Sequence, residues 1–260
     1  MELDGKVAIV FGGSAGIGRA YVWALAEAGA TVIAAARSLG SGPAPERNTL
    51  ADVVARAKEF RGTVHAQYCD VESEDEIARA VEQAVVNFGR IDILVNNAVL
   101  MPMYPALEAP MDVWDKMMRI NVRGPYIACR QAAPHMIRQG NGSIINITAK
   151  AGDLSRWVSR PNDPTLIYAT TKSALNRITV ALADELREHG IAVNALSPGV
   201  VATDTALATT PNLRDLGGKP DTPEVLGPAL VYLAGQTASS MTGQILYTDE
   251  FGSAWPESAA

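Results

Sequence analysis

A tyrosine and a lysine four positions apart, Tyr168 and Lys172 in the stretch YATTK, have a spacing that indicates chemistry. Residues i and i+4 share one face of an α-helix, so the phenol and the ammonium would lie side by side. A neighbouring ammonium stabilises a phenolate and lowers the pKa of the tyrosine, as acid–base catalysis near neutral pH requires. Such a pair is common on surface helices, so its weight depends on where the helix lies.

The glycine-rich stretch VFGGSAGIGRA connects the first strand-like run of the chain to the first helix-like run. Gly12, Gly16 and Gly18 would let the backbone turn sharply and approach a pyrophosphate. The start of the following helix would then offer unpaired N–H groups and the positive end of its dipole. The strand–turn–helix context favours a nucleotide site, although the spacing is GxxxGxG and a tight turn that binds nothing is the alternative.

The end of the second strand-like run should select the nucleotide. An acidic residue there would bind the ribose 2′-hydroxyl and repel a 2′-phosphate. The sequence has AAARS instead, with Arg37 and Ser38 and no acid. A guanidinium pairs well with phosphate, so the sequence favours NADP(H) over NAD(H), unless Arg37 is an ordinary solvated loop residue.

Short apolar runs alternate with amphipathic stretches along the chain, which predicts a parallel sheet covered on both faces by helices. We therefore expect an α/β fold: a single doubly wound (Rossmann) domain over residues 1–260 with a seven-stranded parallel sheet. The expected strands are 6–11, 31–36, a strand within 59–70 that ends at Asp70, 91–98, 142–148, 191–198 and 243–249. The expected helices are 18–30, 73–89, 111–140 with breaks near Gly124-Pro125 and at Pro134, 166–190 and 222–236.

Three irregular segments interrupt this pattern, at 38–49, 152–165 and 203–221. The last two follow expected strands near the Tyr/Lys helix, so we expect them to be substrate loops.

The composition disfavours several functions. With 22 Lys+Arg against 28 Asp+Glu the net charge is −6, and no basic run indicates nucleic-acid binding. The two cysteines, Cys69 and Cys129, have no metal-ligand spacing and suggest buried thiols in a reducing compartment, and the three histidines match no metal pattern. No apolar run is long enough for a membrane span and no signal peptide is apparent, so we expect a cytoplasmic protein.

Taken together, these motifs resemble the short-chain dehydrogenase/reductase family, and the resemblance covers nearly the whole chain. Six motifs occur in the family's order, and they are GGSAGIG, Asp70-Val71 after the third strand, NNA at 96–98, N-V-x-G at 121–124, YATTK, and NALSPGVVAT at 194–203. The resemblance implies an NAD(P)-dependent oxidoreductase that acts on a small-molecule substrate.

The resemblance also implies a role for individual residues. Tyr168 would exchange the substrate proton, Lys172 would bind the nicotinamide ribose and lower the pKa of Tyr168, and Asn121 would hold a water in a proton relay. Asp70 would lie near the adenine and Thr203 near the nicotinamide carboxamide. The implied cofactor-binding residues are Gly12, Ser14, Gly16, Ile17, Gly18, Arg37, Ser38, Asp70, Val71, Asn97, Ala98, Tyr168, Lys172, Pro198, Gly199, Val201 and Thr203. Family members commonly form homodimers or homotetramers through the helices expected here at 111–139 and 166–189.

The main departure from the family is Ala149, at the position where the family usually has a serine that hydrogen-bonds the substrate oxygen. Thr148 could supply the hydroxyl if the strand end were rotated, although alternate strand residues normally face opposite ways. Ser155 or Ser159 could reach in from the following loop. The third possibility is a substrate that needs no such donor, such as an imine, an activated alkene, or a substrate with its own polarising group.

The loop after Ala149 is about six residues longer than the family's usual interval, and it contains Arg156, Trp157 and Arg160. We expect these three residues to form a wall for an anionic or aromatic substrate, the alternative being a solvated surface loop. Val99, in place of a glycine after NNA, and YTDEFG near the C-terminus, in place of DGG, are milder departures. The leading hypothesis is an active oxidoreductase, and the other is a catalytically silent nucleotide-binding homologue with a sensing or scaffolding role.

Overall fold

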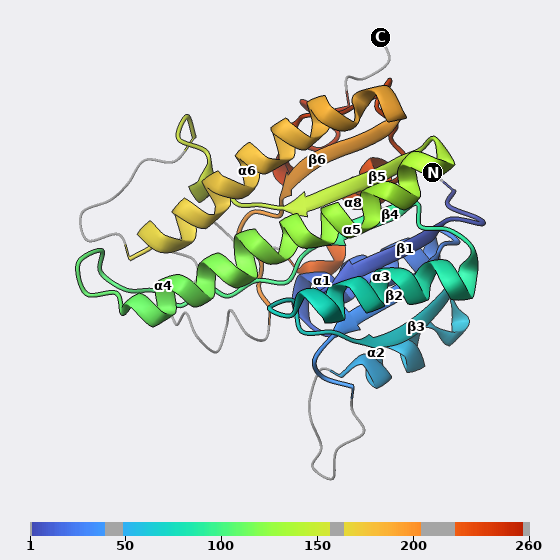
Figure 1. Cartoon of the computed structure of the whole chain (residues 1–260), viewed down its shortest axis with the longest axis horizontal. Helices are drawn as coiled ribbons and strands as arrows, with labels where there is room; N and C mark the ends of the chain where they lie inside the picture. Colours follow the sequence, from blue (N-terminus) through green and yellow to red (C-terminus); the bar gives the residue numbers. More distant parts are fainter. Residues whose placement is uncertain (1, 40–48, 157–163, 204–221, 257–260) are drawn as a thin grey trace.

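The structure is a computed structural model that describes residues 2–39, 49–156, 164–203 and 222–256. Its core is a parallel sheet of seven strands in the order β3-β2-β1-β4-β5-β6-β7 (Figure 1). The strands are β1 (Val7–Phe11), β2 (Thr31–Ala36), β3 (Thr63–Tyr68), β4 (Ile93–Asn96), β5 (Gly142–Ile147), β6 (Ile191–Ser197) and β7 (Ile245–Tyr247). The strand order reverses between β1 and β4, which is where doubly wound sheets bind their ligands.

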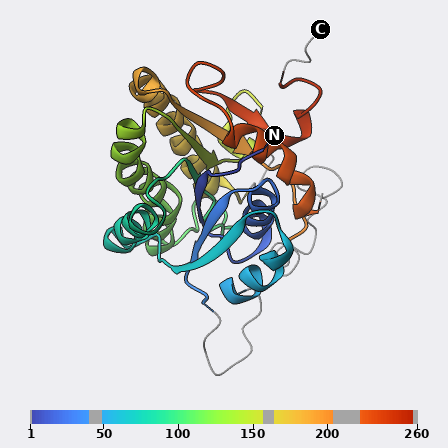
Figure 2. The same cartoon turned by 90° about the vertical axis from the view of Figure 1, so that its right-hand side faces the viewer.

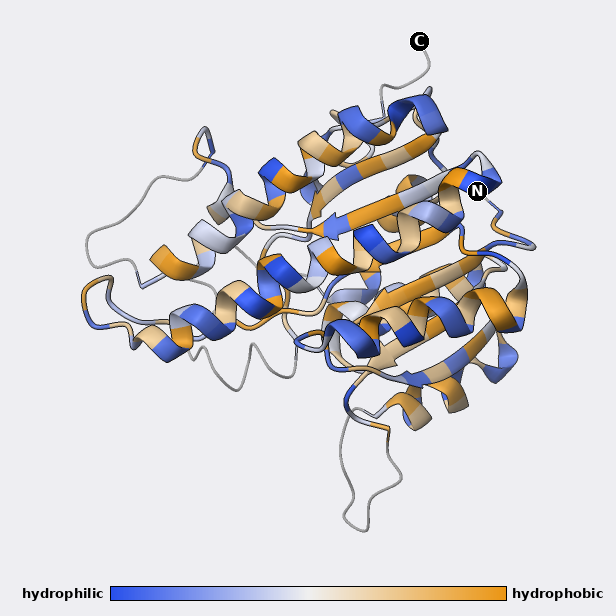
Figure 3. Cartoon of the chain, in the orientation of Figure 1, coloured by the Kyte–Doolittle hydropathy of each residue, from blue (hydrophilic) through white to orange (hydrophobic). Residues whose placement is uncertain are grey.

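Burial explains why the apolar runs form strands. Every residue of β1, β4, β5 and β6 is buried, as expected for parallel strands covered on both faces. β3 lies at the edge of the sheet, where Val64 is its one buried residue and polar residues such as His65 and Gln67 are tolerated. The hydropathy colouring shows apolar strands inside and mixed helix surfaces outside (Figure 3).

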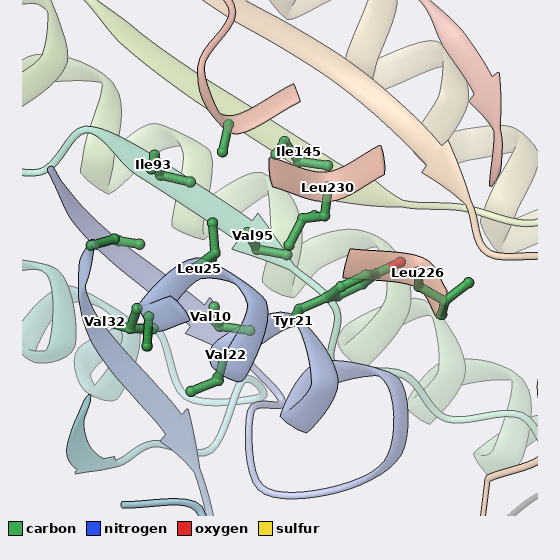
Figure 4. Close-up of a cluster of buried hydrophobic side chains, with 14 of the residues drawn as sticks. Val10, Tyr21, Val22, Leu25, Val32, Ile93, Val95, Ile145, Leu226 and Leu230 are labelled. Carbon is green, nitrogen blue, oxygen red and sulfur yellow. The ribbon is translucent and has the colours of Figure 1, made fainter. Parts of the chain in front are cut away.

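Helices cover both faces of the sheet (Figures 1 and 2). One apolar core joins the sheet to α1 (Gly16–Glu27), α2 (Leu50–Arg56) and α8 (Gly227–Ala234), and Figure 4 shows part of it around Tyr21 and Leu230. The other core joins the sheet to α3 (Glu74–Phe88), α5 (Gly124–Gln139) and α6 (Leu166–Leu186). The shorter helix α4 (Met111–Met118) runs into α5 through a π-helical segment, Arg119–Arg123.

The structure differs from the sequence-based expectation at two helices. α2 was not expected, and it begins with a capping box in which Thr49 and Asp52 bond reciprocally. The expected break at Pro134 is wrong, since α5 continues through it. Pro134 lies on the exposed side of the helix, where water can satisfy the carbonyl that loses its N–H partner. The expected break near Gly124 takes the form of the π-helical segment that precedes it.

In the part of the chain that the structure describes, no helix combines the length and apolar character needed to cross a bilayer.

Candidate active site

The candidate residues gather at the carboxyl edge of the sheet, because parallel strands all end on the same side. The glycine loop follows β1, Arg37 follows β2, Asn97 follows β4, Ala149 follows β5 and Pro198 follows β6. The sequence stretches that carry these residues are far apart, and the sheet brings them to one edge.

The glycine loop is held by the protein's own packing. Gly12 has a φ of 80°, and a Cβ there would lie 2.7 Å from Cα of Ala98. A Cβ on Gly18 would lie 2.0 Å from the carbonyl oxygen of Gly12. The Asn97 side chain donates to the same carbonyl at 3.0 Å. Gly12 and Gly18 are therefore required by the turn and its contact with the segment after β4, whatever the loop binds.

The start of α1 is suited to an anion. Its N-cap residue is Ala15, no side chain caps the helix, and its first turn holds no acidic residue. The N-cap side chain therefore accepts no hydrogen bond from the first N–H groups, and the helix dipole favours a negative charge at this end. Ser14 and Ile17 flank the turn half-buried, and Ile17 also packs against the core. This donor set fits the pyrophosphate of a dinucleotide.

The segment after β6 returns over the glycine loop. A Cβ on Gly16 would lie 3.0 Å from Cγ2 of Thr203. Val201 is buried, and Gly199 takes a φ of 74° that lets the chain turn after Pro198. Thr203 and the helix start thus lie together, as a common ligand would require.

Two residues expected at the nucleotide end also meet. A guanidinium nitrogen of Arg37 lies 4.0 Å from a carboxylate oxygen of Asp70, and the Arg37 side chain is 63% exposed. Ser38, beside Arg37, is half-buried and its carbonyl accepts from the Leu50 amide at 2.8 Å. Val71 packs against the core and its carbonyl lies against Gly124. A phosphate at Arg37 would compete with the Asp70 carboxylate for the guanidinium.

Tyr168 and Lys172 lie on the same face of α6, as their spacing predicts. The Lys172 ammonium lies 5.7 Å from the centroid of the Tyr168 ring. Lys172 is 3% exposed and donates to the carbonyl of Ile147, the last residue of β5, at 2.7 Å. The pair therefore lies at the end of β5, beside Ala149.

The structure contradicts one expectation about this pair. Burial raises the pKa of Tyr168 above its ordinary value, whereas we expected Lys172 to lower it. Burial also lowers the pKa of Lys172 to about 7. Desolvation disfavours the charged form of each group, so it opposes both the phenolate and the ammonium that would stabilise it.

The Asn121 side chain is fully engaged. Its Nδ2 donates to the carbonyl of Leu100 at 2.8 Å and to Oγ1 of Thr171 at 3.1 Å, and its Oδ1 accepts from the Leu100 amide at 2.8 Å. Both amide protons are used, so a relay water could bind Asn121 only through an oxygen. The expectation that Asn121 holds a relay water therefore stays a prediction, and such a water would have to donate to an Asn121 oxygen.

No described candidate replaces the hydroxyl that Ala149 lacks. Thr148 is buried and donates its hydroxyl proton to Oδ1 of Asn176 at 2.6 Å. Ser155 donates to Oδ1 of Asp153 at 2.7 Å. The remaining candidate, Ser159, lies outside the described residues.

Arg156 pairs within the protein, and the wall for an anionic or aromatic substrate stays a prediction. The Arg156 guanidinium pairs with Glu250 and lies 4.5 Å from the centroid of the Tyr247 ring, so its charge is already neutralised. The Tyr247 hydroxyl donates to Asp153. Trp157 and Arg160, the other two expected wall residues, lie outside the described residues.

Lys150 adds a further contact between the loop after β5 and the C-terminal segment, pairing with Asp249 at 2.6 Å. Together with Arg156–Glu250 and Tyr247–Asp153, this pair fastens residues 150–156 to residues 247–250. Sequence reasoning missed this arrangement, and its signal was the unusual YTDEFG stretch. It also missed Thr171 and Asn176, which the stretch YATTK and the regular face of α6 could have indicated.

Within the described ranges, no group of three or more His, Cys, Asp or Glu side chains is placed to hold a metal ion.

The fold and site define a dinucleotide-binding α/β protein with a Tyr/Lys pair at the carboxyl edge of its sheet, at the end of β5. The family model described as short chain dehydrogenase matches residues 6–213. The chain belongs to the short-chain dehydrogenase/reductase family, which confirms the predicted fold and the predicted class, an NAD(P)-dependent oxidoreductase.

Three relatives illustrate the family. The chain is 31% identical to a 3-oxoacyl-(acyl-carrier-protein) reductase of Thermotoga maritima over 96% of this chain and 98% of the relative. A structure of a proposed gluconate 5-dehydrogenase from Beutenbergia cavernae with bound NADP is 30% identical, with a TM-score of 0.81 over 95% of this chain and 96% of that one. A xylitol dehydrogenase structure with bound NAD+ is 26% identical, with a TM-score of 0.82 over 95% and 98%.

Proposed function

We propose that this protein is an NADP(H)-dependent oxidoreductase that transfers hydride between nicotinamide and a carbonyl or alcohol carbon, or a C=N or C=C analogue. Tyr168 is the proposed acid–base group, with Lys172 and Asn121 beside it. The observation that carries the proposal is the Tyr168–Lys172 pair at the end of β5, with the Lys172 ammonium 5.7 Å from the tyrosine ring. A purely structural helix face would not require a buried lysine, whose desolvation is costly.

The chemistry divides between cofactor and protein. Nicotinamide, when bound, supplies or accepts the hydride. In the reducing direction Tyr168 gives its phenolic proton to the substrate oxygen as negative charge develops there. Burial raises the pKa of Tyr168, so the phenol carries its proton at neutral pH before the substrate binds. Lys172 would hold the nicotinamide ribose.

The preference for NADP(H) rests on Arg37. Its exposed guanidinium follows β2, where no acidic side chain occupies the position that would favour NAD(H). Asp70 lies 4.0 Å from Arg37 and would have to release it to a 2′-phosphate. Relatives with either cofactor exist, so the proposal depends on this chain's own residues.

The substrate class follows from Ala149. The hydroxyl protons of Thr148 and Ser155 are engaged within the protein, so neither offers a second donor to a substrate oxygen. We therefore favour a substrate that Tyr168 can protonate without further help, such as an imine, an activated alkene, or a carbonyl with its own polarising group. A simple ketone should be reduced slowly, since losing one such donor costs about 10²–10³ in rate in another enzyme.

The test is turnover with a panel of ketones, aldehydes, imines and activated alkenes, followed through the absorbance of NADPH. Activity that Tyr168→Phe abolishes and Tyr232→Phe leaves intact supports the proposal, because Tyr232 lies on α8 beside Phe251 and Trp255. Turnover that survives in Tyr168→Phe would remove Tyr168 from its role.

The second candidate is a catalytically silent homologue that binds a dinucleotide in a sensing or scaffolding role. Ala149 favours it, because the position lacks the hydroxyl that the family usually has there. The buried Lys172 argues against it. Tight NADPH binding by calorimetry, with no turnover across the whole panel, would favour the silent protein.

We also propose that the protein works in the cytoplasm as a homodimer or homotetramer. The described cysteines, Cys69 and Cys129, are unpaired, which suits a reducing compartment. An open, apolar hollow of about 380 Å³ on the helices expected to associate supports the oligomer, and its lining is Met118, Arg119, Val122, Arg123, Tyr126 and Ile178. Light scattering should show Ile178→Glu as a smaller species than the wild type.

A further inference from the structure

A continuous set of hydrogen bonds joins the loop after β4 to the helix that carries Tyr168. Asn121 bonds to both backbone groups of Leu100, at 2.8 Å each, and its second amide proton goes to Oγ1 of Thr171 at 3.1 Å. The Thr171 hydroxyl in turn donates to the Tyr168 carbonyl at 2.8 Å. Asn121 and Thr171 are both 0% exposed.

The donor and acceptor roles in these hydrogen bonds depend on one another. Because Thr171 gives its proton to the Tyr168 carbonyl, its oxygen faces Asn121 as an acceptor. Because Asn121 gives one proton to Thr171 and the other to Leu100, its amide can adopt only one orientation. Water cannot substitute readily at a site with no exposure, so each partner depends on the others.

Asn121 also lies in the π-helical segment Arg119–Arg123, between α4 and α5. π-Helical turns are rare, and contacts outside their own helix commonly hold them. Here the outside contacts of the Asn121 side chain are Leu100 and Thr171. Loss of either contact should allow this turn to relax.

We propose that Thr171 is a positioning residue for the reaction, which acts through Asn121 and Leu100 rather than by touching the substrate. Thr171 keeps the π-helical turn and the Leu100 loop in register with the helix face that carries Tyr168 and Lys172. The inference rests on the proposed function, because it assigns Thr171 a part in that site.

The adjacent Thr170 provides a matched control. Its hydroxyl also donates to a carbonyl of its own helix, that of Leu166 at 2.8 Å, but Thr170 is more exposed and makes no described bond to another element. Thr170→Val and Thr171→Val therefore remove the same group from neighbouring positions, and only the second breaks a link between elements. Thr171→Ser restores the hydroxyl and is the conservative variant.

The experiment compares these three variants with the wild type. Thr171→Val should lower kcat about 10- to 100-fold, as small displacements of reacting groups do. The Kd for NADPH should stay unchanged, and the deuterium isotope effect on kcat should increase as hydride transfer becomes slower. Thr171→Ser should recover most of kcat, and Thr170→Val should behave as wild type. Equal kcat in Thr171→Val and wild type, or a loss that Thr171→Ser does not restore, would overturn the proposal.

Hydrogen exchange supplies a readout independent of turnover. The Leu100 amide, protected in the wild type by Asn121, should exchange faster in Thr171→Val and not in Thr170→Val. Unchanged exchange would show that Thr171 does not hold Asn121, and would overturn the proposal whatever the kinetics. If the wild-type protein turns over no substrate, the proposed function fails separately, and the exchange rates still decide whether Thr171 positions Leu100.

Discussion

Replacing Lys172 with methionine should stabilise the fold while it abolishes turnover. Lys172 is 3% exposed, and no carboxylate among the described residues pairs with it. It donates a hydrogen bond to the carbonyl of Ile147. An amine in such a place resists protonation, which is why burial lowers its pKa to about 7. Methionine has a similar shape without the charge.

The expected change in the free energy of unfolding follows from the pKa shift of Lys172. One pKa unit corresponds to ~1.4 kcal/mol, so a change from 10.5 to about 7 corresponds to at most ~5 kcal/mol of desolvation. The charged hydrogen bond to Ile147 offsets roughly 1.5–3 kcal/mol of this. We therefore expect Lys172→Met to raise the free energy of unfolding by about 2–3.5 kcal/mol at neutral pH.

The direction of the pKa shift also determines how the stability of the wild type relative to Lys172→Met changes with pH. The folded-state pKa lies below the unfolded value, so the folded protein binds fewer protons than the unfolded chain between pH 7 and 10.5. The cost of the buried charge is complete below pH 7 and declines as pH rises through this window. Wild type should therefore gain stability relative to Lys172→Met on going from about pH 7 to about pH 9.5.

Urea denaturation at both pH values measures this difference, with Lys116→Met as the control. Lys116 is exposed on α4, so the same chemical change there leaves a solvated site in both states. A wild-type stability that exceeds that of Lys172→Met at neutral pH, with no change between the two pH values, would refute the reasoning.

Three further predictions concern other sites. Tyr21 is fully buried with no hydrogen-bond partner among the described residues, so Tyr21→Phe should stabilise the fold by about 1–3 kcal/mol in urea denaturation, whereas exposed Tyr68→Phe should have little effect. A clear loss of stability in Tyr21→Phe would mean that the hydroxyl is satisfied after all. Arg37→Gln should weaken NADPH binding about 10- to 100-fold and leave NADH binding unchanged, which calorimetry would show. Ala149→Ser should speed ketone reduction by about tenfold or more in steady-state assays, and an unchanged rate would mean that another group already donates there.

The sheet could be predicted from sequence because its signal is local. Strands such as Val7–Phe11 and Gly142–Ile147 are buried at every position, so their apolar runs mark them directly. α2 has seven residues, too few for a clear helical period after a Gly/Pro-rich stretch. The continuity of α5 through Pro134 depends on which side of the helix faces water, and that is a property of the packed fold.

The candidate site was likewise predictable only where its signal is local. The pairing of Tyr168 with Lys172 follows from a four-residue spacing, which any helix would satisfy. The pKa directions depend on burial by the whole sheet, and the sequence-based expectation for Tyr168 was wrong for this reason. Arg156 pairs with Glu250, which is 94 positions away in the sequence, so no local sequence pattern predicts the contact.

The fastening of residues 150–156 to residues 247–250 makes the loop after β5 depend on a late part of the chain for its contacts. During translation, Tyr168 and Lys172 are added to the growing chain well before Tyr247, Asp249 and Glu250. Until then the loop beside Ala149 lacks the tyrosine ring and the two carboxylates that it contacts in the finished protein. The first 96 residues, in contrast, already contain both neighbours of β1 and the glycine loop. During synthesis, the elements of the nucleotide half are thus available first, and the substrate side acquires these contacts only after residues 247–250 have been added.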